Sequence, residues 1–174
     1  VKYVLQKMGQ SIVTSHSPYI IEQYDAESVV ILGRDGGNQF SGKPIEADVI
    51  KPKNYRTQRR QFAEAILSRA VFVVEGATEV AAVNAVSTAL EKFHEGYSHN
   101  DLTGVSIFNA ENDQAVLKFG TVFKALGKPV FGMRDDPNDP GSPDAVNAIQ
   151  VFDEFWQSPE KGIERVLANQ VSEE

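Results

Sequence analysis

The sequence predicts an α/β fold: a parallel sheet with flanking helices, preceded by a smaller segment made of a strand, a helix and a hairpin. From residue 69 onward, short apolar runs alternate with helical patterns of ten or more residues, which is typical of βαβ units. Before residue 69, an apolar run, a glycine-rich turn and a second extended run form a hairpin pattern. We therefore expect two parts, residues 1–68 and residues 69–174.

The elements of the first part follow from local signals. Ile12 and Val13 are β-branched and are followed by Ser, Thr and His, which predicts a short buried strand. Ser17 is suited to an N-cap and Pro18 to the first helical position, so a helix is expected next. A hairpin with its turn at residues 35–37 follows. A final amphipathic helix places these side chains at helical spacing: Phe62, Ala65, Ile66 and Arg69.

The second part begins with the apolar strand "VFVV" and continues with alternating helices and strands. Gly127 is expected to end the second of these helices. The expected strands are residues 71–74, 104–108 and 129–133, and the expected helices are residues 77–93, 114–127, 144–156 and 160–170.

Composition limits the kinds of site that the chain can contain. The 174 residues are 41% apolar and 24% charged, as in a globular protein, and no apolar run is long enough for a membrane span. The absence of cysteine excludes thiolate metal sites and disulfides and fits a cytoplasmic protein without a signal leader. Any metal must therefore use oxygen or imidazole ligands. The first residue is not methionine, so we expect a piece of a longer chain.

Charge is distributed unevenly. The net charge of −7 divides into +2 for residues 1–68 and −9 for residues 69–174. An acidic segment repels nucleic acid unless divalent metals or a basic neighbour compensate. The basic cluster within residues 51–60 is either such a neighbour, in contact with a phosphate backbone, or only a solvated helix face.

Carboxylates follow two of the predicted strands directly. Glu75 comes after "VFVV", and Asp135 and Asp136 come after "PVFGM". Since ligands bind outside the carboxyl ends of parallel strands, these acids converge if the two strands are neighbours. Glu79 is expected in the first turn of the next helix, after a turn that Gly76 permits. Such oxygen clusters suit Mg²⁺, and two ions can serve a phosphoryl transfer.

Each acid also has a structural interpretation. Glu79 could stabilise a helix dipole, and Asp135, Asp136 and Asp139 could simply form a turn beside prolines. Glu75 is harder to explain in this way, because a carboxylate directly after four apolar strand residues is desolvated without a partner. Residues 37–43 have the spacing of a phosphate-binding loop, but Pro44 provides neither the hydroxyl nor the amide that such a loop needs.

The phrase "VVEGATE" resembles the glutamate motif of Toprim domains, and "ALGKPVFGMRDDPND" resembles the lead-in to their Asp-x-Asp loop. The resemblance implies a Rossmann-like Toprim fold in residues 69–174, with two Mg²⁺ or Mn²⁺ ions. Asp135 matches the first aspartate of the loop, whereas Pro137 stands at the second. Asp136, Asp139 or the carbonyl of Asn138 could substitute. A later acid of the family matches Glu164, with Asp153 and Glu154 as rivals. The metal ligands implied are Glu75, Glu79, Asp135, Asp136 and Glu164.

The segment "SIVTSHSPYII" resembles the H-loop strand of ABC-type ATPases, in which His16 would reach the γ-phosphate of ATP. An ABC-type ATPase ending that leads into a Toprim domain is the arrangement of the OLD (overcoming lysogenization defect) family. Residues 1–68 would then be the C-terminal fragment of the ATPase domain. Since the chain has no Walker A, ABC signature or Walker B motif, it is not expected to hydrolyse ATP alone.

This resemblance implies a metal-dependent DNA endonuclease, coupled to an ATPase in the full protein. The catalytic residues implied are Glu75, Glu79, Asp135 and Lys161, with Arg134 as another candidate cation. The implied partners are DNA, further copies of the chain that associate through the ATPase part, and a helicase-like protein in anti-phage defence. The alternative is a degenerate, non-catalytic Toprim module for DNA binding or assembly. A topoisomerase-like activity would need Tyr97 near the acids.

Overall fold

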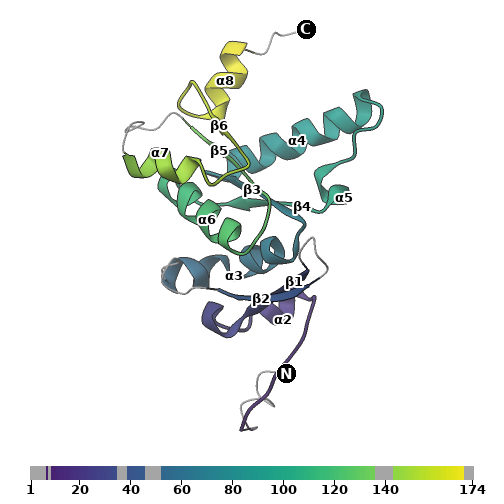
Figure 1. The fold of residues 1–174 in the computed structure, drawn as a ribbon. Helices are drawn as coiled ribbons and strands as arrows, with labels where there is room; N and C mark the ends of the chain where they lie inside the picture. The colour runs from purple at the N-terminus through teal and green to yellow at the C-terminus, as the bar shows by residue number, and fades with distance from the viewer. Residues whose placement is uncertain (1–6, 8, 35–38, 46–51, 136–142, 171–174) are drawn as a thin grey trace.

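The structure is a computed structural model that describes residues 7, 9–34, 39–45, 52–135 and 143–170 (Figure 1). It contains a two-stranded antiparallel sheet and a four-stranded parallel sheet, which confirms the predicted α/β class. The strands are β1 (Val30–Arg34), β2 (Phe40–Pro44), β3 (Ala70–Val74), β4 (Val105–Asn109), β5 (Val130–Arg134) and β6 (Glu154–Gln157). The helices are α2 (Pro18–Ile21), the 3₁₀ helix η1 (Ala26–Ser28), α3 (Pro52–Leu67), α4 (Ala77–Phe93), α5 (Asn100–Thr103), α6 (Asp113–Ala125), α7 (Pro143–Ile149) and α8 (Ile163–Gln170).

In the first part, the hairpin and the two helices are confirmed, but the predicted strand around Ile12 is wrong. Residues 10–17 have no regular secondary structure, and Ile12 is 89% exposed. A strand requires a neighbour for its backbone hydrogen bonds, and no described strand lies beside this segment. The hairpin turn at residues 35–37 lies outside the described residues. β2 forms the return strand of the hairpin, so most of the sequence with phosphate-loop spacing is extended.

The strand order of the parallel sheet, β4-β3-β5-β6, positions the carboxylates. The chain runs from the central β3 through α4 to the edge strand β4, and then through α6 back past β3 to β5. Such crossovers are right-handed. Because the chain crosses from β3 to β4 in one direction along the sheet and from β4 to β5 in the other, α4 and α6 lie on opposite faces of the sheet. The direction changes between β3 and β5, and ligands of open parallel sheets bind at this point, outside the carboxyl ends of the strands.

An aromatic cluster joins α3 to the parallel sheet. Phe62 of α3 stacks on Phe123 of α6 with ring centroids 5.3 Å apart, and Phe108 of β4 lies 4.5 Å from Phe119. Phe62, Phe108 and Phe123 are almost completely buried. α3 therefore shares one hydrophobic core with the sheet, although it precedes residue 69. The domain boundary near residue 68 stays a prediction.

Two glycines make room for Phe152. A Cβ atom added at Gly120 of α6 would lie 1.9 Å from Phe152 Cζ, and one at Gly132 of β5 would lie 2.6 Å from Phe152 Cε1. Neither distance allows a methyl group, so both positions require glycine for the ring to pack between helix and strand. The "LGK" turn is as expected, since Gly127 has a φ of 81° after the end of α6.

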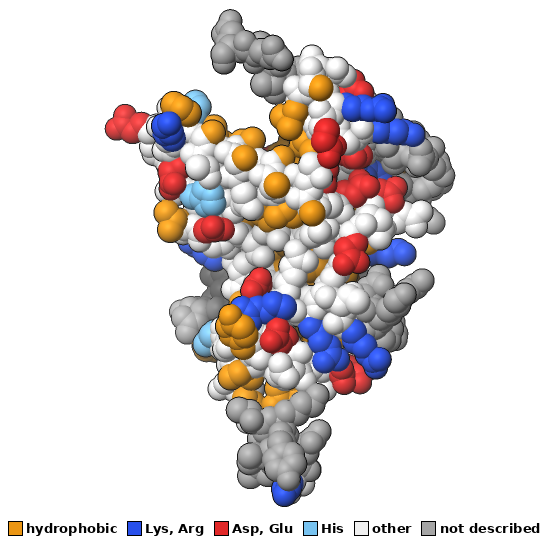
Figure 2. Space-filling model, turned by 180° about the vertical axis from the view of Figure 1, so that it is seen from behind, with side chains coloured by type: hydrophobic (Ala, Val, Ile, Leu, Met, Phe, Trp, Pro, Cys, Tyr) orange, Lys and Arg blue, Asp and Glu red, His pale blue; other side chains and the backbone are white. Residues whose placement is uncertain are grey.

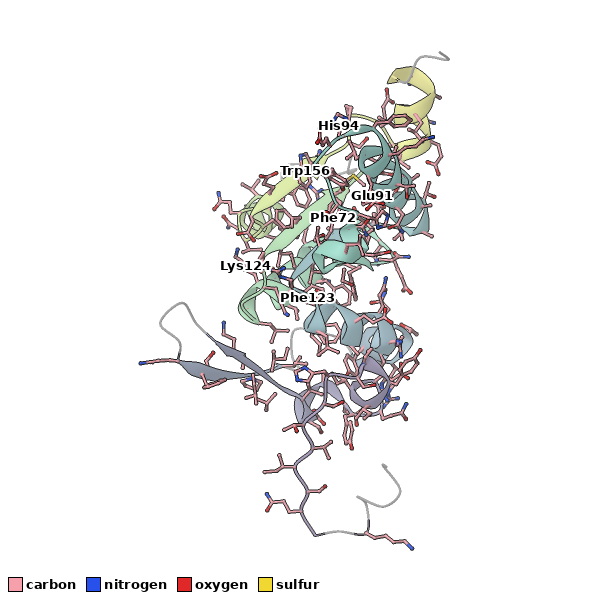
Figure 3. The ribbon with its side chains drawn as sticks, turned by 90° about the vertical axis from the view of Figure 1, so that its right-hand side faces the viewer. Phe72, Glu91, His94, Phe123, Lys124 and Trp156 are labelled. Atoms are coloured by element: carbon pink, nitrogen blue, oxygen red, sulfur yellow. The ribbon has the colours of Figure 1, made fainter. Side chains whose placement is uncertain are left out.

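The predicted helix over residues 144–156 is wrong in its second half. α7 ends at Ile149, and residues 154–157 form β6, which pairs with β5. Phe155 and Trp156 point to opposite faces of the sheet: Phe155 lies 4.9 Å from Phe152, and Trp156 lies 5.7 Å from Phe72 of β3 (Figure 3). Packing on both faces and pairing with β5 outweigh the local helical pattern.

Helix α5 was not predicted. Its N-cap His99 accepts a hydrogen bond from the amide of Asp101, and Gly104 follows with a φ of 77°. These caps stabilise a single turn that has no apolar periodicity. None of the helices in the described ranges is both long and apolar enough to span a bilayer.

Candidate functional site

The carboxyl ends of β3 and β5 bring two predicted site residues together. Glu75 follows β3, Asp135 follows β5, and the two strands pair directly in parallel register. The backbone amide of Asp135 donates a hydrogen bond to Glu75 Oε2 at 3.2 Å. The expectation that these strands are neighbours is therefore confirmed, and one acid is held against the backbone of the other.

Glu79 lies beside this pair, in the first turn of α4. Its side chain is only 6% exposed. The N-cap Gly76 provides no side chain, and a Cβ atom at this position would lie 2.9 Å from Glu79 Oε2. The carboxylate of Glu79 therefore folds back over the turn between β3 and α4, where a larger residue at position 76 would displace it.

Asp113 is a fourth acid at this end of the sheet, and the sequence analysis missed it. It opens α6 directly after the turn that follows β4. In this turn Glu111 has a positive φ of 70°, and its amide donates to Asn109 Oδ1 at 2.9 Å. The Asn112 side chain caps the helix by accepting from the Ala115 amide at 2.9 Å. The signal was available, because the rule applied to β3 and β5 applies equally to the acids after "GVSIF".

Helix α8 contributes a fifth acid. The backbone amide of Gly162 donates a hydrogen bond to the carboxylate of Asp135, and Glu164 lies close enough to Asp135 to raise its pKa. Lys161 is exposed in the turn that leads into α8, next to the amide that binds Asp135. Of the three candidates for the later acid, the structure places Glu164 beside Asp135.

The two rivals lie at the other end of the sheet. Asp153 accepts a hydrogen bond from the amide of Val130, the first residue of β5, and pairs with Lys124 at 2.7 Å. These partners lower the pKa of Asp153 and give it a structural role. Glu154 begins β6, which runs parallel to β5, and so lies at the same amino end.

The electrostatics of the site indicate an excess of negative charge. Burial, which removes the carboxylate from water, raises the pKa of Glu75, and the nearby carboxylates of Asp135, Asp113 and Glu79 raise it further. Burial and the charge of Glu164 raise the pKa of Asp135. The hydrogen bonds from backbone amides oppose these shifts. Figure 2 shows a group of acidic side chains at the upper right, toward the end of the molecule where Figure 1 places α8.

This donor set fits a hard divalent cation. Mg²⁺ and Mn²⁺ prefer carboxylate oxygens, and a cation would offset the mutual repulsion of these acids. Within the described residues, no three such side chains are already close enough to hold an ion. Four residues of the predicted loop lie outside the described residues: Asp136, Pro137, Asn138 and Asp139.

The two other candidate catalytic side chains lie apart from the acids. Arg134 is 3% exposed; its Nη2 donates to Gln157 Oε1 at 3.3 Å, and its guanidinium lies 5.7 Å from the ring of Phe155. Among the described residues, these contacts are all on β6. The hydroxyl of Tyr97 lies 3.0 Å from Ser87 Oγ in the second half of α4, whereas Glu79 lies in the first turn of that helix. The geometry therefore does not favour a tyrosine nucleophile.

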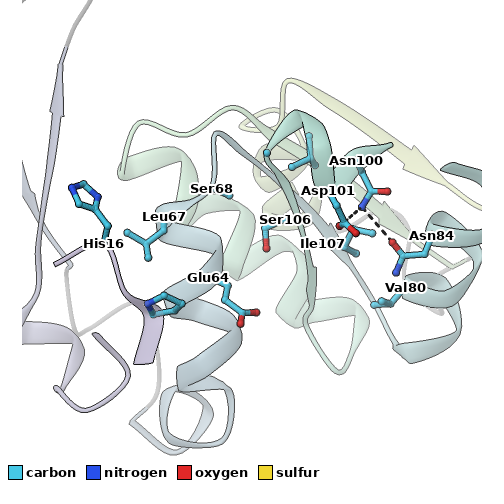
Figure 4. A pocket seen from close by; sticks show the side chains of 13 residues that line it. His16, Glu64, Leu67, Ser68, Val80, Asn84, Asn100, Asp101, Ser106 and Ile107 are labelled. Atoms are coloured by element: carbon cyan, nitrogen blue, oxygen red, sulfur yellow. Dashed lines mark hydrogen bonds between the residues drawn. The ribbon is translucent and has the colours of Figure 1, made fainter. Parts of the chain in front are cut away.

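His16 lies far from the carboxylates in the fold. It lines a cleft with Pro18, α3 and β4 (Figure 4), and its predicted role toward ATP is left as a prediction. The structure therefore brings together Glu75, Glu79, Asp135 and Glu164, adds Asp113, and separates His16 from them.

The raised pKa of Glu75 leads to a prediction about stability and pH. The folded-state pKa of Glu75 exceeds the usual 4.5, so the protonated side chain favours folding. This contribution to the free energy of unfolding is fully present below pH 4.5 and is lost as the pH rises through the folded-state pKa. With metal chelated at about pH 7.5, Glu75→Gln is expected to increase the free energy of unfolding by about 0.5 kcal/mol, a value reduced for solvent screening. This increase in the free energy of unfolding should vanish near pH 4.

Urea denaturation of both proteins at the two pH values measures this difference. Mn²⁺ should then stabilise the parent protein more than Glu75→Gln, because the variant lacks a ligand. Glu95→Gln, an exposed position at the far end of α4, is the matched control. A variant that is less stable than the parent at neutral pH, with metal removed, would contradict the assigned charge excess.

Comparison with known families agrees with this geometry. Residues 66–136 match the family described as "Overcoming lysogenization defect protein-like, TOPRIM domain". The match begins in α3, contains β3, β4 and β5, and ends directly after Asp135. No curated protein matches the chain. A Toprim domain indicates a metal-binding function related to nucleic acids, and residues 66–136 of this chain match such a domain of the OLD-like family.

Proposed function

We propose that this chain is the nuclease part of an ATP-dependent endonuclease and that it hydrolyses phosphodiester bonds in DNA with two Mg²⁺ or Mn²⁺ ions. The observation that supports this most strongly is the hydrogen bond between the Asp135 amide and Glu75. It holds the first acids of both Toprim motifs together at the point where the strand order changes direction.

The acids have distinct roles in this proposal. Glu75, Glu79 and Asp135 hold the ions, and Glu164 together with Asp136 completes the ligand set. When bound, the ions offset the charge of the scissile phosphate and lower the pKa of an attacking water. Glu75 is also proposed to accept the proton of that water, because its carboxylate lies at the carboxyl end of β3, against the Asp135 amide.

The reaction adds the water oxygen to phosphorus and releases one bridging oxygen of the DNA backbone. A cationic side chain would stabilise the developing negative charge on the phosphate in addition to the metals. Lys161 is the better placed candidate, because it adjoins the Gly162 amide that binds Asp135, whereas Arg134 is buried against Phe155. In the full protein, ATP bound by the ATPase domain would regulate the nuclease.

Incubation of the purified chain with supercoiled plasmid and Mg²⁺ or Mn²⁺ tests this proposal. We expect conversion to nicked and linear DNA, which EDTA abolishes and added ATP does not increase for this chain alone. If the chain neither nicks the plasmid nor binds Mn²⁺ by calorimetry, the nuclease assignment is wrong.

A non-catalytic Toprim module is the second candidate. Pro137 at the second aspartate position of the Asp-x-Asp loop favours it, because proline has no side-chain ligand for a metal. Mn²⁺ binding and DNA binding without nicking would support this alternative.

A further inference from the structure

The outer edge of the parallel sheet is only partly covered. β4 is an edge strand, and among the described residues no strand pairs with its outer side. The backbone N–H and C=O groups of an open edge are ready to pair with another extended chain, so folded proteins usually cover them. The groups that cover each part of β4 therefore show where the edge is still open to another chain.

Two glutamine side chains of α3 cover the end of β4. Gln58 Nε2 donates to the carbonyl of Asn109 at 3.3 Å. Gln61, with its amide oriented to satisfy both of its groups, donates to the same carbonyl at 3.3 Å and accepts from the Asn109 amide at 2.8 Å. These side-chain amides substitute for a neighbouring strand at this residue.

The backbone groups of the next two outward-facing residues of β4 are not covered in this way. The Ala110 amide donates inward to Val74 of β3, whereas Asn109 faces outward to the glutamines. Because backbone groups of alternate residues point to opposite edges of a strand, Ile107 and Val105 face outward with Asn109. No described side chain pairs with their backbone groups as the glutamines do with Asn109.

A cleft of about 520 Å³ adjoins this part of the edge (Figure 4). Val105, Ser106 and Ile107 form one wall, α3 contributes Glu64 and Leu67, and α4 and α5 provide the opposite side. The cleft therefore borders β4 from Val105 to Ile107, next to its outward-facing backbone groups.

The charges that line the cleft favour a basic binding partner over a phosphate backbone. Glu64 and Asp101 carry its carboxylates, and their side chains are 45% and 78% exposed. Glu64 is paired with Arg60 at 2.6 Å, which offsets its charge, while Asp101 lies 3.5 Å from His99 Nδ1, the atom that accepts the Asp101 amide hydrogen bond. Carboxylates here repel a phosphate backbone and attract lysine or arginine.

We propose that this cleft binds an extended, basic segment of a partner protein by strand addition to β4. The backbone of that segment would pair with Val105 and Ile107, and a lysine or arginine side chain would reach Glu64 or Asp101. Backbone pairing provides affinity in this mode of recognition, and side-chain pockets provide specificity. The inference does not depend on the proposed nuclease activity, because the cleft and the carboxylate site involve different residues.

The test uses a blocked peptide of about seven residues, alternating valine and threonine with a central lysine, a length that matches a typical strand. Two matched peptides serve as controls: one carries N-methyl groups at alternate residues, and the other has glutamate in place of lysine. We expect the lysine peptide to protect the Ile107 amide from hydrogen exchange. Each control peptide should bind at least about tenfold more weakly.

Variants of the protein test the same contacts. Ile107→Pro removes an outward-facing N–H, which an edge strand tolerates, together with the isoleucine side chain that lines the cleft, and should weaken binding by about tenfold or more. Glu64→Gln combined with Asp101→Asn should remove the preference for lysine over glutamate, and Glu95→Gln should not. If Ile107→Pro fails to fold, the N-methylated peptide on the parent protein still tests backbone pairing.

Three outcomes would overturn the proposal. The methylated and unmodified peptides could bind equally, which would exclude strand addition. The glutamate peptide could bind as well as the lysine peptide, which would exclude a basic partner. Sedimentation could instead reveal a dimer that Ile107→Pro disrupts, and the occupant would then be a second copy of this chain.

Discussion

Glu75→Ala is expected to abolish metal-dependent nicking of supercoiled plasmid, with a loss of more than about 100-fold. Changes to residues that merely support metal ligands cost about 10- to 100-fold, so removal of a direct ligand should cost at least as much. Alanine also cannot accept the Asp135 amide hydrogen bond, and it cannot take the proton that the proposed mechanism transfers from water to Glu75. Initial nicking rates with Mn²⁺ measure the effect.

The control for this experiment separates chemistry from folding. Glu95→Ala removes an exposed glutamate at the far end of α4 and should nick at the parent rate. Circular dichroism and urea denaturation must show that Glu75→Ala is folded. A folded variant that nicks at more than about a tenth of the parent rate would exclude Glu75 as a metal ligand, although another acid could still support the nuclease.

Phe62→Ala is expected to lower the free energy of unfolding by about 3–5 kcal/mol. Phe62 is 1% exposed and lies between Tyr55 of its own helix and three rings of the sheet and α6. Alanine would leave a cavity lined by Phe108 and Phe123, which the rigid sheet cannot close. Urea denaturation followed by circular dichroism measures the loss.

The matched control is Phe93→Ala, at an aromatic residue that is 72% exposed at the end of α4. Its cost should be below about 0.5 kcal/mol. A loss of less than about 1 kcal/mol for Phe62→Ala would mean that α3 packs only loosely on the sheet. The expected large loss would also imply that a fragment starting at residue 69 exposes the aromatic core and needs α3 for stability.

Much of the parallel sheet part was predictable because local and tertiary signals agree. Apolar strands such as "VFVV", capped helices and the turn at Gly127 follow from residue pattern and backbone preference alone, and the structure confirms them. Predictions failed where a neighbour decides the conformation. Residues 154–157 become a strand because β5 offers a pairing edge, and residues 10–17 do not, because no described strand lies beside them.

The candidate site divides in the same way. The residues after β3 and β5 could be identified from sequence, because parallel strands bring their carboxyl ends together. Asp113 was missed although the same rule points to the acids after "GVSIF", and the sheet order then places the start of α6 near Glu75. The choice of Glu164 over Asp153 likewise required the structure, because the two residues lie at opposite ends of β5.

By itself, the sequence determined the α/β class, the order of most elements and the first acid of each Toprim motif, since these depend on patterns within a few residues. Only the tertiary structure decided that β3 lies next to both β4 and β5, that α3 belongs to the hydrophobic core and that β4 has a partly open edge. These features depend on contacts between residues far apart in the chain, such as Phe62 with Phe123 and Asp135 with Glu75. Local periodicity carries no information about such contacts.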